Sequence, residues 1–351
     1  MSRSLESIEF DIKRRLQYFS DKGIRLAVAC SAGKDSMALC EYFYSLIDEF
    51  PELKMSVLHI NYNLRADESI EDENFIRQWC ESKKIDFFLK SVDGSKQSTG
   101  IQNWARDVRY SWFKEWCDAH NGVVCIAHHL KDQAETAVFK LARGSELDKI
   151  SSMSIYSGQY RIWRPFLELD YAQINKLLHG KKIPHREDSS NATIKYSRNR
   201  IRHNVMPELK EISADAERKI ATASRDISDL YTYVLNVHDS LIRSDNLTFN
   251  DLGAMPKSLA TLILAKFIKQ KIVGYKLKSE SINLIYDALL QNEDIDLSLD
   301  SEKVAQCRAG QLKLMVAPKP FDSRKKQHEK YFSLGELKNS IPEDADLEID
   351  P

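Results

Sequence analysis

The sequence predicts an α/β protein, in which a parallel sheet covered by helices precedes a mostly helical domain. Over the first 140 residues, short apolar runs of strand length alternate with stretches of helical periodicity. The run IRLAVAC at 24–30 stops at a turn of small and polar residues. Beyond residue 213, apolar residues recur every three or four positions, which is typical of helices. We therefore expect an α/β domain over 1–212, a helical domain over 213–317 and a short tail over 318–351.

The individual elements follow from these periodicities. In the first domain we expect helices over 5–19, 37–46, 70–83, 102–119 and 130–142, and strands over 24–30, 55–60, 87–92 and 123–129. In the second we expect one long helix over 214–243, helices over 256–272 and 279–291, and a strand over 311–317, with a short strand at 330–334 in the tail. Because the strands are parallel, their polar carboxyl ends should meet at one edge, where such sheets bind ligands.

Composition limits the classes of protein. The chain has 351 residues, of which 42% are hydrophobic and 29% charged, as in a globular protein. It has no apolar run near the roughly 20 residues of a membrane span, and its first 16 residues lack the apolar core of a signal peptide. We therefore expect a cytoplasmic protein with no membrane partner. None of the six cysteines forms a CxxC pair, which favours reduced core residues over a disulfide framework or a zinc site.

The turn SAGKDS at 31–36 separates the first strand from the following helix. A strand–loop–helix of this kind directs backbone N–H groups and the positive end of a helix at one point, which suits a phosphate group. Ser31 and Ser36 add hydroxyl groups, and the carboxylate of Asp35 is suited to Mg²⁺ beside the phosphates. The loop is not the Walker type, because Lys34 is followed by Asp and not by Ser or Thr.

A second polar stretch, HHLKDQAET at 128–136, follows the fourth predicted strand. Asp132 and Glu135 lie three residues apart at the start of a helix, so they share one face. Their carboxylates either complete the N-terminal capping of that helix or form a Mg²⁺ or amine site that faces the phosphate loop. The spacing does not match a zinc site.

Two further stretches are rich in arginine. Arg106 and Arg109 project together from one predicted helix, and they either stabilise a phosphate that gains charge during reaction or form surface salt bridges. From Lys176 to Lys210, nine Lys or Arg accompany three acids, although the net charge of the whole chain is −1. Within this block, basic residues interleaved with an aromatic suit an RNA backbone and unstacked bases; they are Lys195, Arg198, Arg200 and Arg202.

Together these stretches resemble the tRNA(Ile)-lysidine synthases, a family of PP-loop, or N-type, ATP pyrophosphatases. The matching motifs, in order, are SAGKDS (31–36), HINYNLR (59–65), ARDVRY (105–110), HHLKDQAET (128–136) and EDSSN with SRNRIRHNVMPEL (187–209). The resemblance spans about residues 20–210 and is loose over 211–315. Three residues depart from the family pattern. Ala32 replaces the first glycine of SGGxDS, Tyr62 a common histidine, and Lys131 a common acid. If position 32 requires a positive φ, alanine there costs about 1 kcal/mol or more.

The resemblance implies an activity, and with it a set of roles. Such enzymes use ATP and free L-lysine to convert the wobble cytidine of the CAU anticodon of tRNA(Ile) to lysidine, through an adenylated tRNA. ATP would bind to the 31–36 loop, formed by Ser31, Ala32, Gly33, Lys34, Asp35 and Ser36, and to His59.

The remaining roles follow in the same way. Mg²⁺ would bind to Asp35, with Glu135 as a further ligand. Arg106 or Arg109 would stabilise the α-phosphate, and Asp132 or Glu135 would accept the proton of the lysine ammonium. Lys195, Arg198, Arg200 and Arg202 would bind the RNA backbone.

Several alternatives stay open on the sequence alone. A PP-loop tRNA thiolase would use sulfur as the nucleophile, but such enzymes usually need reactive cysteines, often as CxxC. A catalytically degenerate tRNA-binding protein would account for Ala32, Lys131 and the short C-terminus. A small-molecule ligase of the same superfamily would leave the basic block at 195–203 without a role. The sequence also leaves a homodimer open.

Overall fold

The computed structural model describes residues 3–64, 66–95, 97, 100–144, 153–187, 197–272, 277–299 and 303–316. The chain forms two compact units that divide between Asp229 and Leu230, inside helix α10. We had expected the division between 212 and 213, ahead of this helix. The tail over 318–351, with its expected strand at 330–334, and Lys195 lie outside the described residues.

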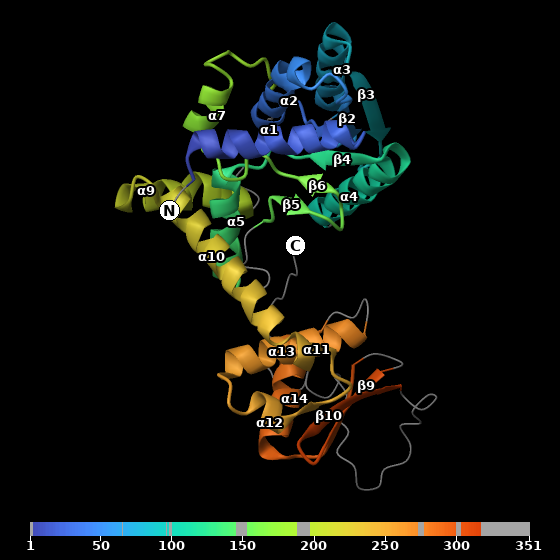
Figure 1. The fold of residues 1–351 in the computed structure, drawn as a ribbon, viewed down its shortest axis with the longest axis vertical. Helices are drawn as coiled ribbons and strands as arrows, with labels where there is room; N and C mark the ends of the chain where they lie inside the picture. Colours follow the sequence, from blue (N-terminus) through green and yellow to red (C-terminus); the bar gives the residue numbers. More distant parts are fainter. Residues whose placement is uncertain are drawn as a thin grey trace. The chain divides into compact units, whose positions relative to one another are not determined.

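The first unit is an α/β fold (Figure 1). Its elements are α1 (Leu5–Asp21), β1 (Arg25–Ala29), α2 (Lys34–Leu46), η1 (Ile47–Glu49), β2 (Met55–Asn61), α3 (Ala66–Lys83), β3 (Asp86–Ser91), α4 (Ile101–His120), β4 (Gly122–Cys125), α5 (Leu130–Ala142), β5 (Tyr156–Ser157), β6 (Ile162–Trp163), α7 (Tyr171–Leu177), α8 (Ser197–Arg200), the π-helical turn η3 (Ile201–Val205), α9 (Met206–Ile212) and α10 (Ala216–Val237).

Six strands of this unit form one sheet in the order β3-β2-β1-β4-β6-β5. All neighbours are parallel except β5, which pairs antiparallel with β6. The predicted parallel sheet is therefore confirmed. The β5–β6 hairpin and α7 were not predicted, because strands of two residues carry no readable alternation. The strand expected over 123–129 was too long, since β4 ends at Cys125 and the two histidines follow in irregular backbone.

Alternation along the strands divides the core between the two faces of the sheet. Leu26 and Val28 of β1 pack with residues of α1, α2, α3 and α7, whereas Ala27 between them packs with residues of α4. Helices therefore cover both faces, as a parallel sheet requires. Gly122 permits this packing on the α4 side, because a Cβ there would lie 2.3 Å from the ring of Trp116.

The second unit combines helices with an antiparallel sheet. Beyond α10 its elements are α11 (Asp239–Arg243), β7 (Leu247–Thr248), α12 (Phe249–Leu252), α13 (Lys257–Lys271), α14 (Ser279–Gln291), β8 (Ile295–Ser298), β9 (Lys303–Arg308) and β10 (Gln311–Val316). The sheet order is β7-β10-β9-β8, and its core is formed by α13 and α14 against the strands.

Two expectations for this unit were wrong in detail. The single helix expected over 214–243 ends at Val237, and a new helix starts at Asp239 after His238. Only β10 of the four strands was predicted, because β7 and β8 are short and the buried residues of β9 are the small Ala305 and Cys307. Among the described helices, none reaches the length and hydropathy that a bilayer-spanning segment requires.

Candidate active site

The loop between β1 and α2 contains a strained alanine. Ala32 has φ +64°, the left-handed region, and is fully buried. Gly33, the N-cap of α2, has φ −70° and ψ 160°, an extended conformation that any residue adopts. Position 32 is thus the one that favours glycine, and alanine there costs about 1 kcal/mol or more. The carbonyl of Ala32 accepts the backbone N–H of Arg186 at 2.9 Å. This hydrogen bond holds the strained turn from outside the loop.

The hydroxyl of Ser36 fixes the shape of the loop from inside. It accepts the N–H of Ser31 at 3.1 Å and donates to the carbonyl of Gly33 at 2.9 Å. Gly33 has no side chain to cap α2, and the first backbone bond of the helix is Met37 N–H to Gly33. The amide N–H groups of 34–36 therefore point out of the helix end, where they suit phosphate oxygens.

Asp35 of the loop is held by two residues from other elements. The hydroxyl of Tyr171, the first residue of α7, donates to Asp35 Oδ1 at 2.7 Å. His129 Nε2 lies 3.5 Å from Asp35 Oδ2. Burial acts to raise the pKa of Asp35, but the hydrogen bond and charge of His129, together with the Tyr171 hydroxyl, lower it overall. Asp35 is therefore ionised, and its side chain remains 38% exposed.

His129 links the two predicted carboxylate sites. It is the N-cap of α5, where its Nδ1 accepts the N–H of Lys131 at 3.2 Å. Because Nδ1 is the acceptor, the ring proton lies on Nε2, which is 3.5 Å from Asp35 Oδ2 and 3.4 Å from Asp132 Oδ2. Burial opposes protonation, yet both carboxylates raise the pKa of His129. A second proton on Nδ1 would cost the cap of α5, so capping opposes the protonation that the carboxylates favour.

The basic block contacts these carboxylates directly. Asp132 Oδ1 accepts from Arg198 at 3.1 Å and from Arg202 at 3.2 Å. Glu135 is fully buried and receives two hydrogen bonds from Arg202, at 2.8 and 2.9 Å. The predicted capping role of Asp132 is present as well, because its Oδ2 accepts the N–H of His129 at 3.1 Å. Two arginines that we assigned to RNA therefore bind protein carboxylates in this structure.

Arg200, between these two arginines in the sequence, is exposed. Arg198 is exposed too but is paired with Asp132, whereas Arg200 has no carboxylate partner among the described residues. The bidentate pairing of Glu135 with Arg202 makes it a poor candidate for a Mg²⁺ ligand, because its oxygens are already satisfied and inaccessible. Asp35 fits better, since it is ionised and partly exposed. Among the described residues, no group of three or more His, Cys, Asp and Glu has the arrangement of a metal site.

His128, Arg164 and Tyr110 form a network that the sequence did not single out. Arg164 is buried, and its Nε donates to His128 Nδ1 at 3.2 Å while its NH2 group lies 3.4 Å from the hydroxyl of Tyr110. Burial, with the positive charge of Arg164, lowers the pKa of His128 to about 3, although Asp132 opposes this. His128 is therefore neutral at pH 7. Arg164 lies in the stretch WRPFLELD at 163–170, and nothing in the sequence indicated its partner.

The predicted arginine pair lies beside this network. The guanidinium of Arg106 stacks on the ring of Tyr110, with its carbon 4.6 Å from the ring centroid. Arg109 Nε donates to the hydroxyl of Tyr62 at 3.3 Å, and that hydroxyl donates to the carbonyl of Ala105. The positive charge of Arg109 also contributes to the lowered pKa of His128. Tyr62, a departure from the family pattern, thus orients Arg109.

His59 of β2 was expected to contact adenosine. Its Nδ1 lies 2.9 Å from the carbonyl of Cys30, immediately before the loop, so Nδ1 carries the proton and donates. The other nitrogen, Nε2, is buried without a partner among the described residues. Burial lowers the pKa of His59. His59 thus supports the end of β1 with one nitrogen and keeps the other as an unused acceptor.

A cavity of about 280 Å³ adjoins the loop. Lys34, Asp35 and Tyr171 line it, together with the positively charged Lys181 and Lys182. Lys34 Nζ lies 4.8 Å from the centroid of the Tyr171 ring. The loop, its carboxylate and a basic rim are therefore contiguous, an arrangement that suits a phosphate-bearing ligand.

A family model described as a PP-loop domain matches residues 6–209, and thus more than half of the chain. The chain belongs to this PP-loop family. The SAGKDS turn described above, with the left-handed residue at Ala32 and the carboxylate at Asp35, lies within the matched residues.

Curated relatives named tRNA(Ile)-lysidine synthase match about half of the chain. That of Staphylococcus epidermidis is 35% identical over 198 residues, which cover 54% of this chain and 45% of the relative. That of Bacteroides thetaiotaomicron is 32% identical over 222 residues, which cover 61% and 50%. The chain thus spans about half the length of the curated relatives it matches.

A solved structure of similar fold is the U34-tRNA thiolase NcsA of Methanococcus maripaludis. The TM-score is 0.51 at 13% sequence identity, and the match covers 64% of this chain and 80% of that chain. At this identity the likeness shows the fold alone.

Proposed function

We propose that this protein ligates L-lysine to C2 of the wobble cytidine of tRNA(Ile) with a CAU anticodon, through an adenylated tRNA and with release of AMP and pyrophosphate. The observation that carries the proposal is the position of His129, whose Nε2 lies within 3.5 Å of both Asp35 and Asp132. It joins the phosphate loop to the second motif in one site. The curated relatives named tRNA(Ile)-lysidine synthase support the same activity.

In the first step, the open amide N–H groups at the start of α2 hold phosphate oxygens of ATP while the α-phosphate passes to O2 of the cytidine. This transfer converts a poor leaving group into AMP. Mg²⁺ at Asp35 would offset negative charge on the phosphates. Arg109, oriented by Tyr62, supplies a fixed positive charge close to the His128 end of the site.

The second step needs a neutral ε-amine on lysine, which is rare at pH 7 because the reference pKa is about 10.4. The cluster of Asp35, Asp132 and Glu135 has three carboxylates against two guanidiniums, those of Arg198 and Arg202. When His129 caps α5 through a neutral ring, one negative charge remains, and this charge attracts an ammonium group. We assign Asp132 to position that group and accept its proton, after the 43%-exposed Arg198 moves aside. Glu135 acts by holding Arg202.

The RNA-binding role within the basic block then belongs to exposed Arg200 and, by extension from the sequence, to Lys195. The second unit, with the tail, is the further tRNA-binding part. The nucleophile is lysine and not sulfur, because all six cysteines are buried and none faces the cavity beside the loop.

The test is incorporation of labelled lysine into tRNA transcripts. The full chain, with ATP and Mg²⁺, should label tRNA(Ile) with a CAU anticodon and should not label the same transcript with the wobble cytidine replaced by uridine. Sulfur incorporation, or tRNA binding without lysine incorporation in either transcript, would overturn the assignment in favour of a thiolase or a binding protein.

A further inference from the structure

A larger cavity lies away from the phosphate loop, between α1 and the β5–β6 edge of the sheet. Its volume is about 910 Å³, within the range of ligand sites in proteins. It extends past Ile24 and Gly122, which precede or begin strands β1 and β4, at the opposite ends of these strands from the loop. The reaction proposed above leaves this cavity without a role.

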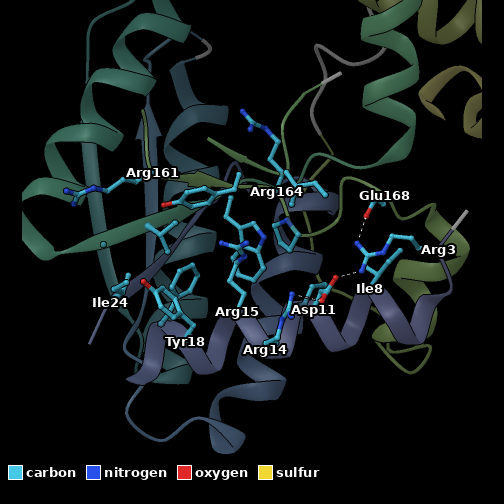
Figure 2. A pocket seen from close by; sticks show the side chains of 18 of the residues that line it. Arg3, Ile8, Asp11, Arg14, Arg15, Tyr18, Ile24, Arg161, Arg164 and Glu168 are labelled. Atoms are coloured by element: carbon cyan, nitrogen blue, oxygen red, sulfur yellow. Dashed lines mark hydrogen bonds and ion pairs between the residues drawn. The ribbon is translucent and has the colours of Figure 1, made fainter. Parts of the chain in front are cut away.

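The cavity is lined by five arginines and two carboxylates. The two carboxylates are neutralised by protein partners, since Asp11 pairs with Arg3 and Arg14, and Glu168 pairs with Arg3 and Arg225. Figure 2 shows Arg161 and Arg3 toward opposite ends of the cavity in this view, with Arg15 between them. Because Arg3 and Arg14 offset these carboxylates, the remaining positive charge of the lining lies at Arg15, Arg161 and Arg164.

Arg15 is the central and least satisfied of these cations. Its guanidinium carbon lies 5.1 Å from the centroid of Tyr156 and 5.9 Å from that of Trp163. Among the described residues, no carboxylate or carbonyl accepts its N–H groups. A half-buried guanidinium that stacks on aromatic rings and keeps its donors free is suited to an anionic ligand with fixed oxygen geometry.

The aromatic residues that line the cavity indicate which kind of anion it would bind. Tyr18 is 52% exposed and Tyr156 is 39% exposed, so both offer ring surface to a planar group. Phosphate-binding arginines next to exposed aromatic rings are typical of sites that take unstacked nucleotides. An acidic peptide would use the arginines but not the rings.

We propose that this cavity binds one unstacked nucleotide of the substrate tRNA, with its phosphate on Arg15 and its base on Tyr156 or Tyr18. The inference rests on the proposed function for the identity of the RNA. Arg164 lines the cavity and also donates to His128, so the same residue borders this cavity and the candidate active site.

The experiment measures binding of fluorescein-labelled tRNA(Ile) to the full chain by anisotropy over roughly 50 to 200 mM salt. Arg15→Gln should weaken binding about tenfold and reduce the salt slope by about one, and Tyr156→Leu should weaken it about tenfold with little change in slope. The matched control is Arg77→Gln, which removes an arginine that stacks on Phe87 away from the cavity. The control should leave both the affinity and the slope unchanged. Arg15→Lys keeps the positive charge and should therefore restore the salt slope of tRNA binding. This variant separates an effect of lost charge from an effect of misfolding.

In a second experiment, free CMP is titrated into the same proteins. Comparison of the two probes shows whether the cavity binds a nucleotide within an RNA chain or a free nucleotide. An Arg15→Gln effect on tRNA alone supports the proposal as stated. An equal effect on CMP also supports a nucleotide site, but identifies the occupant as free nucleotide. Wild-type affinity for both probes in Arg15→Gln and Tyr156→Leu would overturn the inference. If the wild-type protein incorporates no lysine and Arg15→Gln still weakens tRNA binding, the proposed reaction fails and the cavity assignment stands.

Discussion

His129 Nε2 lies 3.5 Å from Oδ2 of Asp35, although 94 positions separate the two residues in the chain. The ring proton is directed to this side because Nδ1 accepts the N–H of Lys131. The helix cap of α5 therefore sets the orientation of a carboxylate in the phosphate loop. This relationship makes the two motifs one site.

Tyr171→Phe should reduce AMP transfer about tenfold, because it removes a hydrogen bond to a charged carboxylate. The pKa of Asp35 is lowered in the folded protein, so the carboxylate stays ionised below its ordinary value of 3.8. Loss of a donor raises that pKa, and the acid limb of the pH profile of pyrophosphate release should move to higher pH. Tyr44→Phe is the control. An unchanged profile in Tyr171→Phe would show that its hydroxyl has no influence on Asp35.

Asp35→Ala and Asp132→Ala should fail at different steps. Asp35→Ala should abolish formation of adenylated tRNA, because the loop loses its carboxylate. Asp132→Ala should still form the adenylated tRNA while lysine use falls sharply, as seen in the KM for lysine and in the yield of lysidine. Thermal unfolding must accompany the assay, because Asp132 also accepts the N–H of His129 in the cap of α5. Normal adenylation by Asp35→Ala would refute the loop assignment.

Arg202→Ala should destabilise the first unit by about 3 kcal/mol or more, because it leaves the fully buried Glu135 without its bidentate partner. Arg198→Ala should cost less, since Arg198 is 43% exposed and Arg202 remains. Denaturant unfolding measures both. In the double variant Arg202→Ala with Glu135→Gln, much of the loss should be recovered, because no unpaired charge is left. Equal losses of unfolding free energy in Arg198→Ala and Arg202→Ala would contradict the assignment of Arg202 as the main partner of Glu135.

Position 32 should tolerate glycine and reject a β-branched residue. Ala32→Gly removes the cost of positive φ, about 1 kcal/mol. Part of this gain in stability is cancelled, because glycine has greater conformational freedom in the unfolded chain. We expect equal or slightly higher thermal stability and normal ATP binding. Ala32→Val, buried and left-handed, should lower the unfolding temperature and weaken ATP binding. Calorimetry with ATP titration measures both, and a harmless valine would show that the loop is not strained there.

The sequence predicted the sheet and the convergence of its polar loops because these depend on local periodicity and on the parallel connection. SAGKDS, HHLKDQAET and the basic block were all located from their residues. The partners within the site were not predicted. Arg202 lies 67 positions from Glu135, and Tyr171 lies 136 positions from Asp35. In the sequence alone, the basic block has the composition of a nucleic-acid-binding surface. The fold shows that two of its arginines, Arg198 and Arg202, instead pair with buried carboxylates.

The second unit was less predictable for a different reason. Its antiparallel sheet uses strands of two to six residues, such as Ile295–Ser298. β7 and β8 contain too few alternations to be told from loops, and β9, although as long as β10, buries only small side chains. The buried faces become apparent only when α13 and α14 pack against them.

A single-turnover reaction with α-labelled ATP tests the central claim most directly. Wild-type protein with tRNA(Ile) and no lysine should accumulate label on the tRNA as AMP. Addition of unlabelled lysine should then release that label as free AMP while lysidine appears in equal amount. Label that never reaches the tRNA, or lysidine that forms without passing through labelled tRNA, would contradict the account.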